Sequence, residues 1–264
     1  MKIGINGICG RMGRSVLGIL LRKGYELSAA FDSPSSDWLG KDAGALVSQR
    51  ELGVKISALD KAALKKCDCV IDFSLPASSM ELLAAAETQK VALVMGTTGF
   101  SDEQKAKIEK AASVIPLVFS PNMAVGVNLF FKLTEFAAAA LKGGFDAEIL
   151  EMHHKFKKDA PSGTARRLAE IIKANMHGMA DARILTGRGG LECERSDSEI
   201  GVMALRGGDV VGEHTVYFIG EGERLELTIR STSRDTLAGG AVLAAEFLIG
   251  KNAGLYSMYD VIGI

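Results

Sequence analysis

Several features that mark particular classes of protein are missing from this sequence. Only four of its 264 residues are cysteines, at positions 9, 67, 69 and 193, too few and too scattered for a disulfide framework. No apolar run approaches the ~20 residues needed to cross a bilayer. Neither sign of charge dominates, with 31 basic residues against 32 acidic ones, so no net positive field attracts nucleic acid or a membrane surface. We therefore expect no nucleic-acid partner and no membrane partner.

A signal segment and a metal-binding pattern are missing as well. The first residues contain no apolar stretch before a cleavage site, so we expect a soluble cytoplasmic protein. Cys67 and Cys69 flank a single residue, which matches no common zinc spacing, and we interpret both as small hydrophobic residues of a buried strand. The paired histidines at 153 and 154 have no arrangement of Asp, Glu or Cys around them in the sequence. No bound metal is expected.

The first 120 residues alternate short apolar runs with longer amphipathic ones. The expected strands are 2–6, 27–31, 69–73, 91–95 and 115–119, and the expected helices between them include 15–22, 78–88 and 102–112. Strands that alternate with helices favour a parallel sheet covered on both faces. The pattern therefore predicts a Rossmann-like, doubly wound α/β domain.

The pattern changes after Asn122. A helix at 127–141, a strand at 147–151 and a helix from about Ser162 are followed by a stretch to Glu199 that we expect to be irregular. Three strands then follow closely at 200–205, 215–219 and 225–231, without helical spacers. This spacing favours a mixed or antiparallel sheet, and a last helix at 236–248 is expected to pack on the first domain. We predict a first domain of residues 1–123 and 235–264 and a second, α+β domain of residues 124–234.

A glycine-rich turn follows the first strand. Its spacing is Gly-x-x-Gly-x-x-Gly, and its residues are Gly7, Ile8, Cys9, Gly10, Arg11, Met12 and Gly13. Glycines at such a turn allow a tight bend and close approach of a pyrophosphate, which the amides of the next helix then bind. A structural turn without a ligand is the alternative. The context of strand, turn, helix and strand favours a dinucleotide-binding site.

Asp32 stands at the end of the second strand, where an acidic residue commonly accepts hydrogen bonds from the adenosine ribose. The alternative for Asp32 is a purely structural role, as a solvated strand end or as a helix cap. Ser33 follows it, so no basic residue stands there to receive the 2′-phosphate of NADP. Arg11 and Arg14 could still reach that phosphate. The sequence therefore predicts NADH and/or NADPH as cofactor, with NADH favoured.

Two more segments follow strands of the same predicted sheet. They comprise Gly96, Thr97 and Thr98 after the fourth strand, and Ser120, Pro121, Asn122 and Met123 after the fifth. Ligands of open α/β sheets bind outside the carboxyl ends of the strands, and small residues there admit the nicotinamide half of a cofactor. Ordinary structural turns are the alternative for both segments.

The segment from Glu151 to Ala165 is the most informative in the chain. Two histidines and a basic run are followed by Pro-Ser-Gly-Thr, where a helix is expected to begin with free amides and a capping hydroxyl. Cations near a helix N-terminus suit a substrate with more than one carboxylate. Solvated lysines, surface histidines and a simple helix cap are the alternatives.

This segment, Glu-x-His-His-x-x-Lys-x-Asp-x-Pro-Ser-Gly-Thr-Ala, resembles the signature of the 4-hydroxy-tetrahydrodipicolinate reductase (dihydrodipicolinate reductase) family. The resemblance extends to the glycine-rich turn and to the later motif at 206–215, and it covers the chain from end to end. It implies that His153 is a proton donor and acceptor, that Lys157 is a proton donor and that His154 contacts the substrate. It also implies that Gly163 and Thr164 bind a substrate carboxylate, and that residues 7–12, 32, 96–98 and 120–123 contact the cofactor.

The resemblance further implies the reduction of a cyclic dicarboxylate, 4-hydroxy-tetrahydrodipicolinate, to tetrahydrodipicolinate with loss of water, in the biosynthesis of diaminopimelate and lysine. It implies a homotetramer assembled through the second domain, which then serves in substrate binding and oligomerisation. Two alternatives are another two-domain NAD(P)-dependent amino-acid dehydrogenase and a non-catalytic dinucleotide sensor. The combination of histidines, lysine and Ser-Gly-Thr argues against both.

Overall fold

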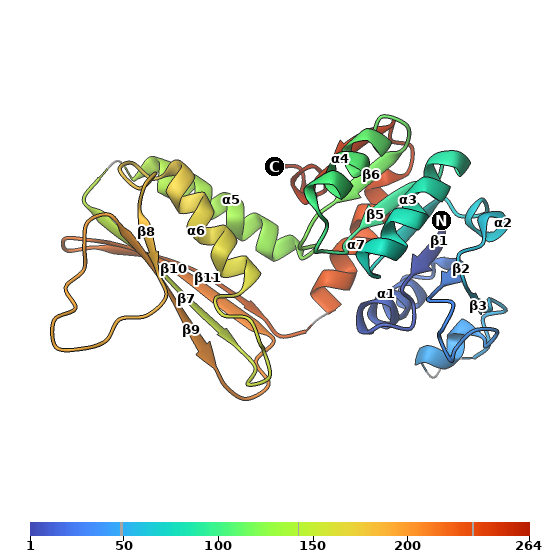
Figure 1. The fold of residues 1–264 in the computed structure, drawn as a ribbon, viewed down its shortest axis with the longest axis horizontal. Helices are drawn as coiled ribbons and strands as arrows, with labels where there is room; N and C mark the ends of the chain where they lie inside the picture. The colour runs from blue at the N-terminus through green and yellow to red at the C-terminus, as the bar shows by residue number, and fades with distance from the viewer. Residues whose placement is uncertain (48–49, 142, 234) are drawn as a thin grey trace. The chain divides into compact units, whose positions relative to one another are not determined.

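The structure is a computed structural model that describes residues 1–47, 50–141, 143–233 and 235–264. The chain forms two compact units, one from residues 1–125 and 235–264, the other from residues 126–233. Figure 1 shows the C-terminal helices, coloured red, within the unit that contains the blue N-terminus. The sequence predicted domain boundaries at 123/124 and 234/235, and Arg234 itself lies outside the described residues.

The first unit contains a seven-stranded sheet in which every described pair of neighbours is parallel. The strand order is β12-β6-β5-β4-β1-β2-β3. The strands are β1 Lys2–Asn6, β2 Glu26–Phe31, β3 Ile56–Ser57, β4 Cys69–Asp72, β5 Ala92–Met95, β6 Pro116–Phe119 and β12 Gly254–Tyr256. The doubly wound parallel sheet is thus confirmed. The sequence did not predict its edge strands β3 and β12, because two or three residues cannot show a period-2 pattern.

Helices cover both faces of this sheet. One face carries α1 Arg11–Arg22, η1 Ala43–Val47, α7 Asp235–Leu248 and α8 Met258–Ile262, and the other carries α2 Lys61–Leu64, α3 Pro76–Gln89 and α4 Asp102–Ala111. Side chains of a strand alternate between its faces. Cys69 and Ile71 accordingly pack with α1 and α7, whereas Val70 between them packs with α3 and α4. Two separate apolar cores therefore hold the carboxyl edge of the sheet in place.

The second unit contains a mixed sheet of order β11-β10-β7-β9-β8. Its elements are α5 Val125–Ala140, β7 Phe145–His153, α6 Gly163–Asn175, β8 Arg183–Leu185, β9 Glu199–Arg206, β10 Gly212–Gly220 and β11 Arg224–Ser231. β10 runs antiparallel to β7 and β11, whereas β9 runs parallel to β7 and β8. The expectation that the stretch before Glu199 is irregular was wrong at β8, whose three largely exposed residues carry no apolar alternation.

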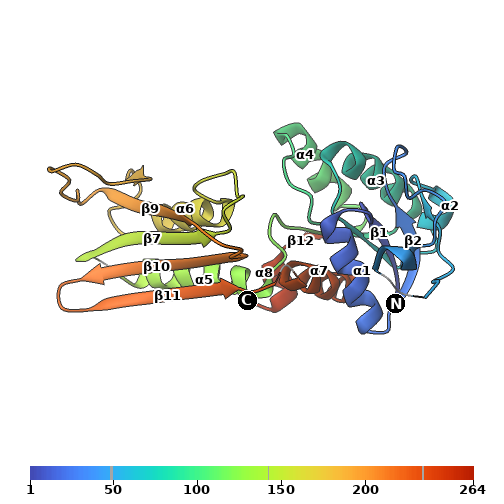
Figure 2. The ribbon, with the colours of Figure 1, turned by 90° about the horizontal axis from the view of Figure 1, so that it is seen from below.

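The two faces of the mixed sheet differ in character. Figure 2 shows β9, β7, β10 and β11 side by side with α5 and α6 on one face. Ile149, Val216 and Phe218 are buried on that helix-covered face, where α6 contacts β7, β9 and β10. The opposite face carries apolar side chains that stay partly exposed, among them Leu205 and Ile219. The helix-covered face also carries the polar cluster described below.

Candidate active site

The glycine-rich turn has the geometry of a phosphate-binding turn. Gly7 has a φ of +77°, which favours glycine, and a Cβ built at Gly13 would lie 2.3 Å from the Gly7 carbonyl oxygen and 2.5 Å from the Ile8 Cα. Gly10 is the N-cap of α1, and within the described residues no side chain caps that helix or places a negative charge in its first turn. The amides at the start of α1 are therefore suited to bind an anionic pyrophosphate.

Asp32 immediately follows β2 and ties the glycine-rich turn to that strand. Its carboxylate accepts hydrogen bonds from the Cys9 amide at 2.7 Å and from the Ser33 amide at 2.8 Å. The structural role considered for Asp32 is therefore present in the fold. Each carboxylate oxygen has further acceptor capacity, so a ribose hydroxyl can bind to the same group.

A buried carboxylate joins one of the segments expected to contact the cofactor, the turn after β5, to the ends of β1 and β4. Asp72, which ends β4, is fully buried and accepts hydrogen bonds from Asn6, Ser74, Ser79 and Thr97 at 2.5–2.8 Å. These contacts connect the ends of β1 and β4 with the turn after β5. No role was predicted for Asp72 from the sequence, where an Asp at the end of an apolar strand is a signal of such a network.

The other residues expected at the cofactor site lie at the carboxyl edge of the same sheet. Ile8 and Met123 are buried in the core, so only their backbone is available to a ligand. Ser120 donates a hydrogen bond to the Asn122 carbonyl at 2.8 Å, which shapes the turn after β6. The exposed members of the set are Gly10, Arg11, Thr98 and Pro121, whereas Cys9, Met12 and Gly96 are half-buried.

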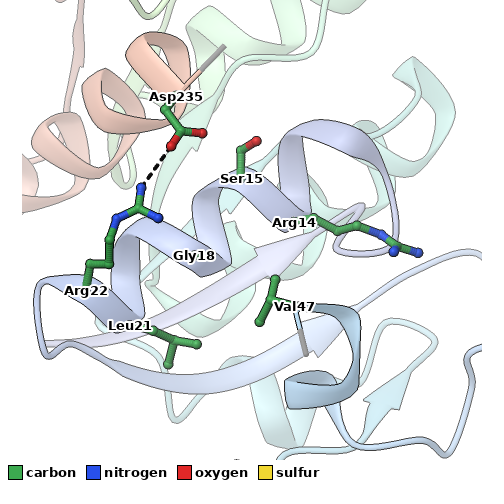
Figure 3. A pocket seen from close by; sticks show the side chains of 7 residues that line it. All are labelled: Arg14, Ser15, Gly18, Leu21, Arg22, Val47 and Asp235. Carbon is green, nitrogen blue, oxygen red and sulfur yellow. Dashed lines mark hydrogen bonds and ion pairs between the residues drawn. The ribbon is translucent and has the colours of Figure 1, made fainter. Parts of the chain in front are cut away.

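A separate hollow of the first unit is shown in Figure 3, where Arg22 pairs with Asp235 at 2.9 Å. Its lining residues are Arg14, Ser15, Gly18, Leu21, Arg22, Val47 and Asp235. Of the residues named for the cofactor, only Arg14, considered for a 2′-phosphate, lines it, and the glycine-rich turn and the segments at 96–98 and 120–123 do not. The hollow is therefore not the predicted dinucleotide site.

The second unit gathers a polar cluster at the ends of β7 and β9, beside β10 and the N-terminus of α6. Glu151 is fully buried and accepts two hydrogen bonds from the Arg206 guanidinium, both at 2.8 Å. The same carboxylate lies 2.5 Å from Nδ1 of His153 and accepts the Ser162 amide at 3.0 Å. Nε2 of buried His214 lies 3.1 Å from the Ser162 hydroxyl. Of these residues, the sequence assigned a chemical role only to His153.

The ring of His153 is held from several sides. It meets the His214 ring edge-on, with centroids 5.2 Å apart, and a Cβ built at Gly212 would lie 3.0 Å from its Nε2. Burial lowers the pKa of His153, and the hydrogen bond to Glu151 partly opposes that shift. Burial also lowers the pKa of His214, to about 4. His214 is therefore a neutral hydrogen-bonding group near pH 7, whereas His153 is suited to exchange a proton.

Lys157 and His154 lie in the loop that follows β7, not on a helix. The Lys157 ammonium pairs with Asp159 at 2.8 Å, and it is close enough to His153 for its charge to lower the His153 pKa. The His154 amide donates to the Val210 carbonyl at 2.7 Å, and its buried Nδ1 has no partner among the described residues. The structure thus brings His153 and Lys157 together, and it places His154 next to them.

The N-terminus of α6 provides an anion site beside this cluster. Ser162 is the N-cap, and its hydroxyl accepts the Ala165 amide at 3.2 Å. Gly163 is exposed, and no described atom lies within 4 Å of a Cβ built on it. No acidic residue lies in the first turn of this helix. Gly163 and Thr164 can therefore present their amides to a carboxylate.

Neither a membrane-spanning helix nor a metal-binding cluster occurs within the described residues. None of the helices there combines the length and the apolar character that crossing a bilayer requires. In the same part of the chain, no group of three or more His, Cys, Asp or Glu is placed to hold a metal ion.

A Rossmann-like unit with a dinucleotide-binding edge, followed by a mixed-sheet unit with an acid–base cluster, defines a two-domain, nicotinamide-dependent oxidoreductase. The family model for the N-terminus of dihydrodipicolinate reductase matches residues 1–123, and the model for its C-terminus matches residues 126–262. The chain belongs to the dihydrodipicolinate reductase family.

Relatives and solved structures agree with this assignment. The chain is 47% identical to the 4-hydroxy-tetrahydrodipicolinate reductases of Aromatoleum aromaticum and Cupriavidus pinatubonensis, covering 100% of this chain and 96% and 100% of theirs. A dipicolinate-bound dihydrodipicolinate reductase from Paenisporosarcina sp. TG-14 superimposes with a TM-score of 0.76 at 26% identity, covering 99% of both chains. An amine dehydrogenase from Mycobacterium smegmatis shares the fold, with a TM-score of 0.61 at 15% identity over 98% of this chain and 95% of that one.

Proposed function

We propose that this chain reduces 4-hydroxy-tetrahydrodipicolinate to tetrahydrodipicolinate and water, in the route to diaminopimelate and lysine. The observation that carries the proposal is the pairing of His153 with an anion-binding helix N-terminus through Glu151. A cyclic dicarboxylate needs both features, a proton-transfer group near the ring and amides for a carboxylate. The relatives carry this reductase name, and the related solved enzyme binds dipicolinate, which is also a six-membered ring with two carboxylates.

The residues of the second unit have distinct tasks in this reaction. When bound, the reduced nicotinamide supplies a hydride to the conjugated imine that forms as the 4-hydroxyl leaves as water. His153 exchanges a proton with the substrate through a ring nitrogen, and Lys157 delivers the proton that balances hydride addition. Gly163 and Thr164 hold one carboxylate, while His154 contacts the substrate. The cluster therefore orients the ring and moves protons, and the first unit binds the dinucleotide.

A bulkier residue at position 163 tests the carboxylate site. We expect Gly163→Val to raise the KM for the substrate and to weaken inhibition by pyridine-2,6-dicarboxylate at least tenfold, about 1.4 kcal/mol. The added side chain meets no described protein atom within 4 Å of its Cβ, so the loss would come from crowding of the ligand. Inhibition and NADH binding are measured in parallel. Unchanged inhibition would assign the carboxylate to another part of the cluster.

Asp32 is proposed to bind the adenosine ribose and to favour NADH, because its negative charge would repel a 2′-phosphate. Asp32→Asn keeps an acceptor for the Cys9 amide but removes the charge. We expect the KM for NADH to rise and the preference for NADH over NADPH to narrow by about 2–5-fold, as loss of a partly exposed charge interaction implies. The ratio of kcat/KM for the two cofactors is the measurement. A lower kcat/KM for both, with an unchanged ratio, would leave Asp32 with only its structural role.

The open face of the mixed sheet is proposed to form the interface of a cytoplasmic homotetramer. Apolar side chains that remain partly exposed there, such as Leu205 and Ile219, would become buried against a second copy. Light scattering after size exclusion measures the assembly. A monomer at micromolar concentration would contradict it.

The two alternative functions are separated by a turnover assay. NADH or NADPH is mixed with the protein and with 4-hydroxy-tetrahydrodipicolinate, which a synthase generates in the assay mixture from pyruvate and aspartate semialdehyde. The proposal expects dinucleotide oxidation that depends on this substrate. Oxidation of the dinucleotide with a keto acid and ammonia instead would favour another amino-acid dehydrogenase, and tight dinucleotide binding without turnover of any substrate would favour a sensor.

A further inference from the structure

One buried ion pair lies between the two functional parts of the second unit. Glu151 on β7 is fully buried, and its carboxylate faces His153, the Ser162 amide and the Arg206 guanidinium together. We propose that Glu151 and Arg206 form a positioning pair that fixes both the proton-transfer nitrogen of His153 and the carboxylate-binding N-terminus of α6. The inference rests on the proposed function, since it concerns how that site is held.

The hydrogen bonds of Glu151 divide evenly between its two oxygens. Oε2 lies 2.5 Å from Nδ1 of His153 and accepts Nη1 of Arg206 at 2.8 Å. Oε1 accepts the Ser162 amide at 3.0 Å and Nη2 of Arg206 at 2.8 Å. A carboxylate with four donors in these directions cannot turn without losing some of them. Its orientation, and that of every donor bound to it, is therefore fixed.

The contact with Glu151 determines which ring nitrogen of His153 can exchange a proton with the substrate. An ionised carboxylate only accepts, so Nδ1 carries the proton and Nε2 is left for exchange with the substrate. The small Gly212 leaves room beside Nε2, and the ring of His214 supports the imidazole edge-on. A carboxylate that holds a histidine in one tautomer is a device that active sites use repeatedly.

The charge of Glu151 is retained because Arg206 balances it. Burial raises the pKa of Glu151, but hydrogen bonds from Arg206, His153 and Ser162 together lower it below its ordinary value. The guanidinium is anchored in turn, since its Nη atoms donate to the carbonyls of Leu205 and Asp159, both at 2.7 Å. Glu151 is thus a fixed negative charge near neutral pH, with its partner held by the backbone.

The same carboxylate sets the start of α6. The Ser162 amide is bound to Glu151, and the Ser162 hydroxyl is bound to the Ala165 amide and lies beside His214. Gly163 and Thr164 follow directly. A shift of Glu151 would therefore move the histidine and the carboxylate site at once, which is why the pair is expected to affect both kcat and substrate KM.

Glu151→Gln in the full chain tests the pair, because it keeps the size of the side chain and removes its charge. We expect kcat to fall about 10–100-fold, the range found when a partner that orients a functional histidine is lost. The substrate KM should rise and NADH affinity should stay unchanged. Four charged or titratable groups face His153, namely Glu151, Lys157, Arg206 and His214. Of these four groups, only Glu151 favours the protonated form of His153. Loss of the Glu151 charge should therefore lower the pKa of His153, and the limb of the kcat–pH profile that reports His153 should move to lower pH.

Glu199→Gln is the matched control. Glu199 is also a buried glutamate of the same sheet that pairs with an arginine, Arg188, at 2.6 Å, but it lies at the other end of β9. We expect Glu199→Gln to lower thermal stability while leaving kcat and the pH profile unchanged. Arg206→Lys tests the same pair if Glu151→Gln does not fold, because lysine keeps the positive charge but cannot form the two parallel hydrogen bonds to Glu151.

A readout that needs no turnover separates this inference from the proposed function. In ¹⁵N-labelled protein, the signals of His153 report its tautomer and its titration. The positioning pair predicts an Nδ1-protonated ring in the parent and loss of that single tautomer in Glu151→Gln. An unchanged His153 tautomer and pH profile in the folded variant would overturn the inference. Equal losses of kcat in Glu151→Gln and Glu199→Gln would also overturn it, whereas an inactive parent with the expected tautomer would contradict only the proposed function.

Discussion

Replacing His153 or Lys157 with alanine is expected to lower kcat by about 10²–10⁴-fold, the usual contribution of a positioned acid or base. His153 is held by Glu151 at 2.5 Å, and Lys157 lies in the same loop, paired with Asp159 at 2.8 Å. Lys157→Ala should also raise the KM of the anionic substrate. Steady-state kinetics give kcat and KM, and fluorescence titration gives NADH affinity, which should barely change because both residues belong to the second unit.

Two exposed residues of the same types provide the controls for this experiment. Lys158 is an exposed lysine next to Lys157, and His177 is an exposed histidine beyond α6. Lys158→Ala and His177→Ala should keep kcat within about twofold of the parent, since isolated surface substitutions change little. If His153→Ala and Lys157→Ala behaved like these controls, the assigned acid–base roles would be wrong.

A methyl group at Gly13 is expected to abolish dinucleotide binding. A Cβ there would lie 2.3 Å from the Gly7 carbonyl oxygen and 2.5 Å from the Ile8 Cα, both of which are backbone atoms of the turn. The turn must open, and the amides that would face the pyrophosphate move with it. We expect Gly13→Ala to weaken NADH binding at least tenfold, about 1.4 kcal/mol, and to lower the melting temperature.

Gly18→Ala, in the same helix, is the matched control. A Cβ at Gly18 comes no closer than 3.5 Å to Nη1 of Arg22, which is ordinary contact with a flexible side chain. Since alanine favours a helix over glycine by about 0.5–1 kcal/mol, this variant should be as stable as the parent or more stable, with normal NADH binding. Parent-like NADH affinity in Gly13→Ala would remove the glycine-rich turn from the cofactor site.

The sequence predicted those parts of the fold that depend on local patterns. Strands such as β1 and β4 are apolar runs between helices, and the glycine-rich turn follows its strand directly, so the parallel sheet and its ligand-binding edge could be inferred. The short strands β3, β8 and β12 could not, because their pairing with longer neighbours defines them and two or three residues leave no periodicity.

The candidate site residues named from the sequence are neighbours in the chain, whereas the contacts that join distant segments could not be predicted. His153, Lys157 and Gly163 share one segment with a recognisable motif. Arg206 binds Glu151 across 55 residues, and Asn6 binds Asp72 across 66. Such pairs arise from the register between strands. The register of β7 against β9 places His153 opposite Arg206, and no local sequence pattern shows that register.

Transfer of deuterium tests the central claim, that this chain moves a hydride from a nicotinamide to the cyclic dicarboxylate. The protein is mixed with reduced dinucleotide that carries two deuterium atoms at C4 of the nicotinamide ring and with freshly generated 4-hydroxy-tetrahydrodipicolinate. The mass of the product is then measured by mass spectrometry. The account predicts tetrahydrodipicolinate that contains one deuterium from the cofactor, formed in step with dinucleotide oxidation. Product without deuterium, or no product while the protein binds the dinucleotide normally, would contradict it.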